Sequence, residues 1–355
     1  MPDNPPLTDL RDLTLKELTD FIVESGEPGF RARQIFSWLY RPGISSFAAM
    51  TNLSLTFRDR LKDMACLSTL QVDRREEAAD GTVKYAFKLT DNALIESVLI
   101  PDNNRHTLCV SSQAGCAMGC AFCLTGTMGL RRNLSAAEIV NQVIHTRNEL
   151  EADGKGRINN LVFMGMGEPL ANYNNLRRAL DILTDDHGLD FSQRRITVST
   201  CGLVPGIEQL GAETRVNLAI SLHAANNETR SRLLPVNQTY DITALLKACR
   251  AYPLPKRRRI MIEYVLLAGI NDSPGDARQL IKILHKLRCK INLLPCNETD
   301  TLPFKRPERA VVEKFQHILQ EAGYTAIIRE SRGAEISAAC GQLANKNCKN
   351  CDQTI

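Results

Sequence analysis

The sequence predicts an α/β fold built around a parallel sheet. From about residue 107 onward, short apolar runs rich in β-branched residues alternate with longer amphipathic segments, giving about six β/α units. Parallel strands need such crossovers, because each strand must return to the same edge before the next begins. The alternation leaves two architectures open, an open barrel and a doubly wound sheet. In both, functional groups gather beyond the carboxyl ends of the strands.

The expected strands are short and apolar, and helical stretches separate them. One of these, 135–154, opens with Ser135 and has Glu138 three positions on, the pattern of a capping box. Other helices are expected at 174–184, 242–252, 274–287 and 307–323. The strands are expected at TLCVSS (107–112), NLVFMG (160–165), ITVST (196–200), VNLAISLH (216–223), RIMIEYVLL (259–267), INLLP (291–295) and TAIIRE (325–330).

Residues 1 to about 65 have a helical pattern. Thr14 and Glu17 form a second capping-box pair, and the segment 30–43 supplies apolar side chains for burial, namely Phe30, Ile35, Phe36, Trp38 and Leu39. The arginines of that segment, Arg31, Arg33 and Arg41, suit either a solvated helical face or a contact with RNA.

The period changes to two between residues 67 and 100. Alternating stretches flank Asp80-Gly81, which is a hairpin turn signal, and ALIESVLIP (93–101) reads as a further strand. We therefore expect a helical domain at 1–66, a β-extension at 67–104, the α/β core at 105–335 and a C-terminal segment at 336–355.

Composition indicates an ordinary folded protein. Of 355 residues, 43% are hydrophobic and 24% charged, and the net charge of +4 does not repel a polyanion. The N-terminus lacks a signal-peptide pattern, and no stretch approaches the roughly 20 apolar residues that span a bilayer. We expect a cytoplasmic protein without membrane contact. In that reducing compartment, some of the twelve cysteines should carry metal or redox chemistry.

Three cysteines follow the first core strand with metal-ligand spacing. Cys116, Cys120 and Cys123 form a CxxxCxxC motif with no fourth cysteine at ligand spacing. Thiolates suit zinc or iron–sulfur clusters. A four-iron cluster held this way keeps one iron open to chelate the amine and carboxylate of S-adenosylmethionine (SAM). The alternatives are three unrelated cysteines, or zinc with a distant fourth ligand.

This motif, with Phe122 before the last cysteine, resembles the radical SAM superfamily. FMGMGEPL (163–170), VSTCGLVPGI (198–207), ISLHAANNETRSRLLPVN (220–237), AACGQL (338–343) and CVSSQAGCAMGC (109–120) together resemble the RlmN family of dual-specificity RNA methyltransferases, to which the Cfr enzymes are related. The resemblance covers residues 90 to 343 strongly and the N-terminal part loosely. It implies a partial (β/α)6 barrel of TIM type, with an N-terminal helical domain that contacts RNA, a small β-extension and one [4Fe-4S] cluster on the three cysteines.

The family methylates carbon 2 of an adenosine in 23S rRNA, at the peptidyl transferase centre, and of the adenosine next to the anticodon in tRNA. Carbon 2 is electron-poor and does not attack a sulfonium, so a radical from SAM makes the carbon fragment reactive instead. The alternatives are Cfr-like methylation of carbon 8 and a non-catalytic iron–sulfur protein that binds RNA. The GMGEPL and SRGAEISAACGQL segments favour carbon 2.

The resemblance also assigns residues, with two SAM molecules used in each turnover. It implies that Cys340 carries the methyl group, that Cys109 resolves the adduct by forming a disulfide with Cys340, and that Glu96 accepts the carbon 2 proton. Without the resemblance, Glu96 would be an exposed strand residue, His223 an interior histidine and Asn297 a turn residue. The implied SAM contacts are Gly167, Glu168, Ser199, Ser221, Leu222, His223 and Asn297.

Several features depart from the family or lie outside its motifs. Cys201 stands where serine is usual, and Cys296 where an aromatic residue is common, beside implied SAM contacts. Cys348 and Cys351 form a CxxC that suits either disulfide reduction or an inert tail. Cys66, Cys249 and Cys289 are expected in the core. The basic runs 256–259, 131–132 and 194–195 suit either RNA phosphates or solvent. A flavodoxin-type electron donor and a monomeric state are further expectations.

Overall fold

The computed structural model describes residues 7–103 and 105–343, which form two compact units. One unit comprises the described residues up to Gln71 together with 134–158 and 173–192. The other comprises 72–133, 159–172 and the chain from Gln193. The boundaries predicted from the sequence, after residues 66, 104 and 335, remain predictions. Within the described residues, no helix combines the length and apolar character needed to cross a membrane.

The first unit is mainly helical, as predicted. Capping boxes are present at Thr14 with Glu17 and at Ser135 with Glu138. Phe30 was expected to be buried but is 60% exposed, because it begins its helix on the side away from buried Ile35 and Phe36. The elements are β1 (Thr8–Asp9), η1 (Leu10–Asp12), α1 (Leu15–Glu24), α2 (Phe30–Leu39), η2 (Phe47–Ala49), α3 (Leu55–Met64), β2 (Ala65–Cys66), α5 (Ala136–Ala152) and α6 (Tyr173–Thr184).

The buried side chain of Arg11 forms hydrogen bonds with several segments of this unit. Its side chain is buried, and its guanidinium donates to the backbone carbonyls of Ser68 and Ile44, each at 2.6 Å. Weaker bonds of 3.4 Å reach the Leu39 carbonyl and Asn141 Oδ1, on α5. A buried cation is tolerated here because carbonyl and amide oxygens surround it.

Replacing Arg11 with methionine is expected to lower the free energy of unfolding by about 3 kcal/mol, because buried carbonyls lose their donors while the volume is nearly kept. Urea unfolding of the full chain measures this loss. Arg33→Met is the matched control, since Arg33 lies exposed on α2. A loss equal to that of the control would contradict the role given to Arg11.

The second unit contains a ten-stranded sheet in the order β14-β13-β12-β11-β10-β9-β6-β5-β4-β3. The strands from β9 to β14 pair parallel with one another, and β4, β5 and β6 pair antiparallel. The strands are β3 (Gln71–Glu77), β4 (Val83–Lys88), β5 (Leu94–Asp102), β6 (Arg105–Cys109), β9 (Ile158–Phe163), β10 (Ile196–Thr200), β11 (Asn217–Ser221), β12 (Ile260–Leu266), β13 (Cys289–Pro295) and β14 (Ala326–Ile328).

Residues from distant strands of this sheet line one pocket. Thr107 of β6 and Lys290 of β13 both face it, although four strands separate β6 from β13. A flat sheet cannot place these positions around one space, so the sheet is curved. This curvature decides between the two predicted architectures in favour of the partial barrel.

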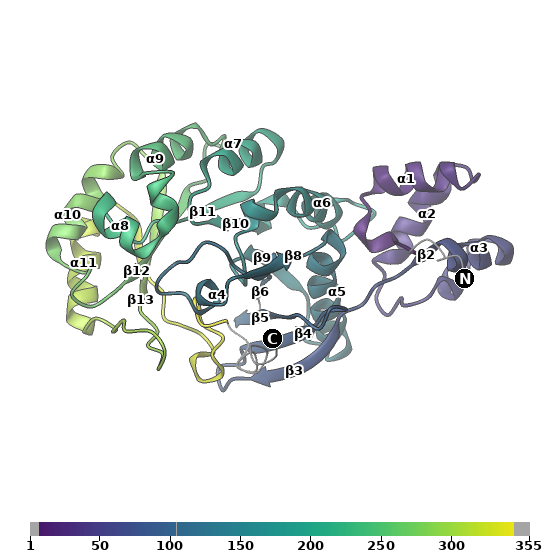
Figure 1. The fold of residues 1–355 in the computed structure, drawn as a ribbon, viewed down its shortest axis with the longest axis horizontal. Coiled ribbons are helices and arrows are strands. Elements are labelled where there is room, and N and C mark those ends of the chain that lie inside the picture. Colours follow the sequence, from purple (N-terminus) through teal and green to yellow (C-terminus); the bar gives the residue numbers. More distant parts are fainter. Residues whose placement is uncertain (1–6, 104, 344–355) are drawn as a thin grey trace, which may run out of the picture. The chain divides into compact units, whose positions relative to one another are not determined.

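The remaining elements flank this sheet. Figure 1 shows α8–α11 beside strands β11–β13. The predicted turn at Asp80-Gly81 is confirmed, since the Ala78 N–H donates to the Thr82 carbonyl at 2.8 Å. The elements are β7 (Gln113–Gly115), paired antiparallel with β8 (Leu130–Asn133), α4 (Leu124–Thr127), η3 (Pro169–Asn172), η4 (Gln193–Arg195), α7 (Val204–Glu213), α8 (Asn227–Leu233), η5 (Pro235–Gln238), α9 (Ile242–Ala251), α10 (Pro274–Ile283), α11 (Arg309–Glu321) and η6 (Ala334–Ile336).

Candidate active site

A pocket of about 850 Å³ lies within the partial barrel. Alternate residues of β12 (Met261, Glu263 and Val265) face it, because side chains alternate between the two faces of a sheet. The strand register places Ser221 level with Glu263, and Glu263 level with Asn292. The three cysteines of the motif line the same pocket, beyond the carboxyl ends of these strands. The volume suits a nucleotide-sized ligand.

The loop 116–123 connects β7 to α4, and its backbone is tightly held. The Cys116 N–H donates to the Gly129 carbonyl at 2.8 Å, and the Cys123 N–H to the Cys120 carbonyl at 3.1 Å. Gly115, at φ +79°, must be glycine, since a Cβ there would lie 2.0 Å from the Gly129 carbonyl oxygen. Gly115 and the bond from Cys116 to Gly129 therefore hold the start of the cysteine loop beside the residue that precedes β8.

The three thiols suit a cluster. Burial, together with the charge of Cys123, raises the pKa of Cys116 to about 11, although the N–H groups of Met118 and Glu168 favour its thiolate. Burial and the charges of Cys123 and Cys116 also raise the pKa of Cys120. Among the described side chains, no three candidate ligands are grouped around a single ion. A [4Fe-4S] cluster does not require such a group, because each cysteine binds a different iron atom.

Gly167 and Glu168 follow β9 at the pocket wall. Gly167 has φ +99°, and a Cβ there would lie 2.5 Å from Gln113 Cβ, so only glycine fits. Glu168 is buried, and its carboxylate accepts the N–H groups of Leu170 at 3.0 Å and Cys201 at 2.8 Å. Burial raises the pKa of this carboxyl, while those N–H groups oppose the shift.

The segment after β11 places His223 beside the cysteine loop. His223 has φ +58°, its Nδ1 accepts the Val265 N–H at 3.0 Å, and its ring meets Phe122 edge-on at 4.7 Å. Burial lowers the pKa of His223 to about 3, so the ring is neutral. Leu222 does not line the pocket, and its N–H donates to the Glu263 carbonyl at 3.0 Å. The other six predicted SAM contacts line it.

Arg230, which the sequence reasoning did not select, orders the carboxyl ends of β10 and β11. It is fully buried, and its guanidinium donates to the carbonyls of Cys201 at 2.6 Å and Leu222 at 3.1 Å, and to Asn237 Oδ1 at 2.9 Å. The pattern TRSRLLPVN gave no signal that one of its two arginines is internal.

The segment carrying Cys340 is held by two parts of the second unit. Lys84 Nζ donates to the Ile336 carbonyl at 2.5 Å, and Asp80 Oδ2 accepts the Gly333 N–H at 3.2 Å. On the other side, the Leu124 N–H donates to the Gly341 carbonyl at 2.8 Å, and Thr125 Oγ1 to the Leu343 carbonyl at 2.5 Å. Cys348 and Cys351 lie outside the described residues.

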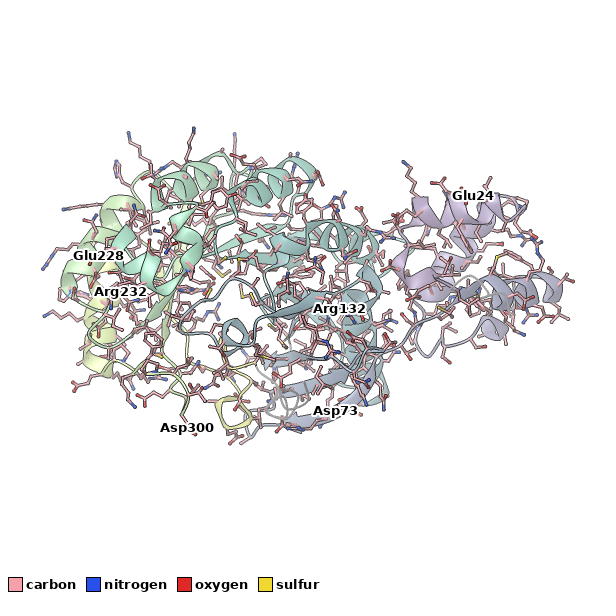
Figure 2. All side chains as sticks on the ribbon, in the orientation of Figure 1. Glu24, Asp73, Arg132, Glu228, Arg232 and Asp300 are labelled. Carbon is pink, nitrogen blue, oxygen red and sulfur yellow. The ribbon has the colours of Figure 1, made fainter. Side chains whose placement is uncertain are left out.

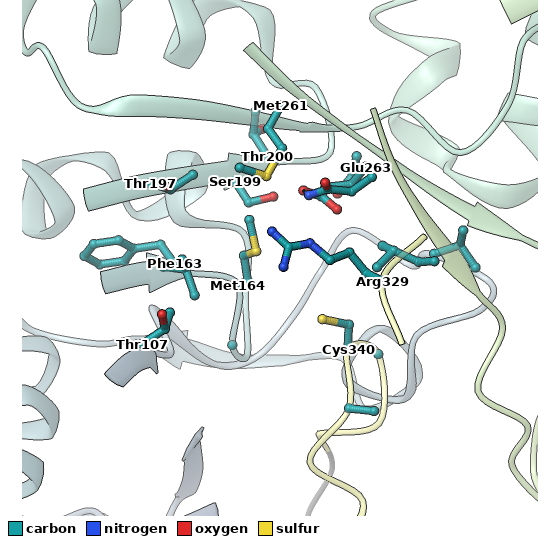
Figure 3. A pocket seen from close by; sticks show the side chains of 18 of the residues that line it. Thr107, Phe163, Met164, Thr197, Ser199, Thr200, Met261, Glu263, Arg329 and Cys340 are labelled. Carbon is teal, nitrogen blue, oxygen red and sulfur yellow. Dashed lines mark hydrogen bonds between the residues drawn. The ribbon is translucent and has the colours of Figure 1, made fainter. Parts of the chain in front are cut away.

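Cys340 is open to the pocket, and Figure 3 shows its side chain there together with Arg329, Ser199 and Glu263. Surrounding protein raises the pKa of its thiol to about 11. Cys109, at the end of β6, is buried but near enough that an ionised Cys340 raises its pKa further. The two predicted sulfur residues thus lie within electrostatic reach of each other.

Glu96 lies on β5. From the strand pattern alone its side chain was expected to be exposed, and this expectation is wrong. Glu96 is 5% exposed, and Lys84 Nζ, which also donates to the Ile336 carbonyl, lies 3.7 Å from its Oε1. Glu96 and Cys109 do not line the pocket itself. Glu96 is close to Cys109 in the sheet, because its neighbour Val98 pairs with Cys109.

Three further polar residues of the pocket were missed, namely Glu263, Asn292 and Arg329. A charged or amide side chain inside an apolar strand such as RIMIEYVLL or INLLP is itself a signal, since parallel strands are normally apolar on both faces. Burial raises the pKa of Glu263 to about 7, against the bond from Asn292 and the charges of Arg329 and Lys290.

The shifted Glu263 predicts a pH dependence of stability. The folded state keeps this carboxyl protonated up to pH of about 7, whereas the unfolded chain ionises near its ordinary pKa of 4.5. Rising pH therefore favours unfolding across that window, by about 3 kcal/mol in total. Urea unfolding of metal-free wild type and Glu263→Gln from pH 4.5 to 7.5 measures it. The wild type should lose stability relative to the variant, and parallel curves would contradict the shift.

The basic runs separate into two kinds. Arg132, labelled in Figure 2, donates to Asp91 at 2.9 and 3.2 Å, and Arg131 donates to the Asp91 carbonyl, so the 131–132 run is engaged within the chain. The other two runs lie at the amino ends of β10 and β12. Their arginines line the pocket, and three of them, Arg195, Arg258 and Arg259, also donate hydrogen bonds within the chain; the lining residues are Arg194, Arg195, Arg257, Arg258 and Arg259.

Comparison with known proteins agrees with this geometry. Residues 8–67 match the model of the ribosomal RNA large subunit methyltransferase N-terminal domain, and residues 110–281 match the radical SAM superfamily. The dual-specificity RNA methyltransferase RlmN of Desulfotalea psychrophila is 52% identical over 95% of this chain and 94% of its own. That of Geobacter sulfurreducens is 51% identical over 96% and 93%.

A solved structure also matches. A radical SAM methyltransferase from Sphaerobacter thermophilus is 45% identical, covers 95% of this chain and 99% of its own, and superposes with a TM-score of 0.89. The curved sheet with three cysteines beyond its carboxyl ends defines a radical SAM enzyme. Within that class, the chain belongs to the RlmN family of dual-specificity RNA methyltransferases.

Proposed function

We propose that this protein methylates carbon 2 of an adenosine in 23S rRNA, at the peptidyl transferase centre, and of the adenosine next to the anticodon in tRNA. One observation carries the proposal. Cys340 opens into the pocket that also receives the three-cysteine loop, and Cys109 lies beside it. An electron-transfer or RNA-binding protein needs the three cysteines of the loop, but it has no use for the sulfurs of Cys109 and Cys340.

Cys116, Cys120 and Cys123 would hold a [4Fe-4S] cluster. When bound, the cluster and SAM supply a 5′-deoxyadenosyl radical. The pocket residues Gly167, Glu168, Ser199, Ser221, His223 and Asn297 surround the space proposed for SAM, and Leu222 supports them from behind. Two hydrogen bonds hold this side of the pocket in place: the Glu168 carboxylate accepts the Cys201 N–H, and neutral His223 accepts the Val265 N–H.

The sulfurs divide the covalent work. Cys340 loses its thiol proton and attacks the methyl group of one SAM, so that an S–CH3 bond forms and S-adenosylhomocysteine leaves. After loss of a hydrogen atom, the S-methyl carbon of Cys340 bonds to carbon 2 of adenine, and the unpaired electron of this adduct would pass to a one-electron acceptor, for which the oxidised cluster is suited. Glu96 accepts the carbon 2 proton. Lys84, at 3.7 Å, compensates the charge of Glu96 in its buried position.

Cys109 completes the turnover. Its thiolate attacks the sulfur of Cys340, the sulfur–carbon bond breaks, and the released carbon takes a proton to become the methyl group. The Cys109–Cys340 disulfide then needs two electrons from a dithiol before the next turnover. A second SAM and a one-electron donor, for which a flavodoxin is suited, complete the requirements. We propose that the enzyme acts as a monomer in the cytoplasm.

RNA contacts are proposed at two places. The five arginines at the amino ends of β10 and β12 line the opening of the pocket opposite the cysteine loop, where they can neutralise phosphates beside the target nucleotide. The helical N-terminal region offers exposed Phe30 with Arg31 4.9 Å over its ring, a pair suited to stacking on an unpaired base.

The test is complementation of a bacterial strain that lacks its own carbon 2 methyltransferase. Nucleosides from its 23S rRNA and tRNA, separated and measured by mass spectrometry, should regain 2-methyladenosine in both RNAs. The appearance of 8-methyladenosine would instead support the Cfr-like reaction. If the chain is expressed and neither nucleoside returns in either RNA, the proposal fails.

A further inference from the structure

Two polar side chains inside the barrel have no part in the chemistry above. Glu263 and Asn292 lie on neighbouring strands at matching register, and both face the pocket although they are only 7% and 4% exposed. Asn292 Nδ2 donates to Glu263 Oε1 at 2.9 Å. Burying such a pair costs stability unless the groups are satisfied.

The pair is not satisfied within the described part of the chain. Asn292 Oδ1 is buried and has no hydrogen-bond partner there. Above a pH of about 7 Glu263 is ionised, and its carboxylate then requires the amide nitrogen, and not the amide oxygen, of Asn292 to face it. Asn292 therefore presents an open acceptor, Oδ1, and the second hydrogen of Nδ2 as an adjacent donor.

An adjacent acceptor and donor on one amide match one edge of adenine. The N6 amine donates and N7 accepts, and asparagine pairs with both in a bidentate contact. Binding through this edge leaves carbon 2, on the far side of the ring, free to meet a reactive group. Guanine offers an oxygen in place of the N6 amine and would face Asn292 Oδ1 with a second acceptor.

We propose that Asn292 reads the N6/N7 edge of the target adenine in the RNA, and that Glu263 is the positioning residue that orients its amide. This inference rests on the proposed function and adds the recognition of its substrate base. SAM also contains adenine, so the same chemistry has two sources. The RNA is favoured because Cys340, which must meet the RNA base, lines the same pocket as Glu263 and Asn292 (Figure 3).

The test uses the reconstituted, cluster-loaded enzyme and RNA hairpins that carry adenine, purine or 7-deazaadenine at the target position. Purine lacks the N6 donor, and 7-deazaadenine lacks the N7 acceptor. In internal competition, wild type should prefer adenine by roughly ten- to hundredfold in kcat/KM over each analogue. Asn292→Leu should bring both ratios close to one.

Two further variants keep the result interpretable. Thr197→Val, which alters a pocket hydroxyl without changing its shape, should keep the wild-type ratios. The exchange Glu263→Gln with Asn292→Asp keeps a bonded amide–carboxylate pair and an open acceptor, but removes the donor toward N7. It should retain discrimination against purine and lose discrimination against 7-deazaadenine, which a merely structural role of the pair does not predict.

Binding of SAM, measured by equilibrium dialysis for each variant, distinguishes the two sources. If folded, cluster-loaded Asn292→Leu keeps the wild-type ratios, the proposal is wrong. A weakened SAM affinity with unchanged RNA ratios also overturns it, and assigns the pair to the cofactor. Failure of the proposed function is a separate result, since wild type would then leave the unmodified adenine hairpin without 2-methyladenosine.

Discussion

Cys120→Ala is expected to abolish the iron–sulfur cluster and, with it, all formation of 5′-deoxyadenosine. The reason is the ligand count: three thiols already leave one iron without a protein ligand, and removal of a second ligand leaves too few bonds to hold the cubane. After anaerobic reconstitution with iron and sulfide, wild type should be brown and contain iron and sulfide in equal amounts. The variant should be colourless and retain neither.

The matched control is Cys201→Ser. Cys201 is a buried thiol of the same pocket that interacts electrostatically with Cys116 and Cys120, but it stands outside the CxxxCxxC motif. This variant should bind the full cluster and cleave SAM. Zinc in the wild-type protein, with no 5′-deoxyadenosine after reduction by dithionite, would show that the cysteine loop is a different kind of metal site.

Cys109→Ala is expected to stop the reaction with RNA covalently attached to the protein, whereas Cys340→Ala should give no methylated RNA and no attached RNA. The difference follows from the order of the steps, since Cys340 bonds to the base before Cys109 releases it. The adduct should run as a shifted band in denaturing gels and disappear on nuclease treatment. Mass spectrometry of the nuclease-treated variant should locate the remaining nucleotide on Cys340.

Cys249→Ala controls for the loss of a buried thiol, since Cys249 lies on α9 among apolar residues. It should behave as wild type in both assays. Free, fully methylated RNA from Cys109→Ala would remove the resolving role from Cys109. Methylation by Cys340→Ala would require another methyl carrier.

Much of the fold could be predicted from the sequence because local patterns decide it. Thr14 with Glu17 and Ser135 with Glu138 are capping boxes that depend on residues three positions apart. The alternation of β and α segments predicted the parallel sheet. Its curvature was predicted by the resemblance alone, because local patterns do not show which residues of β6 and β13 face one another across the pocket.

The site was predictable only where motifs carry it. The spacing of the motif alone identifies Cys116, Cys120 and Cys123 as candidate ligands. Cys109 and Cys340 are 231 positions apart and were matched by resemblance alone. Glu96 was expected to be exposed, since nothing in its own strand shows that Lys84, which also bonds the Ile336 carbonyl, lies beside it. Glu263 and Asn292 were missed because their pairing joins two strands whose register the sequence does not give.

The hydrogen bonds from Leu124 and Thr125 to the segment around Cys340 affect how the enzyme responds to oxygen. These two residues follow Cys123 directly, so the placement of the methyl-accepting sulfur depends on the conformation of the iron-binding loop. We expect oxygen damage at the iron centre to displace Cys340 as well. A molecule with a damaged cluster would then also stop transferring methyl groups from SAM to Cys340, so this link would limit the unproductive consumption of SAM.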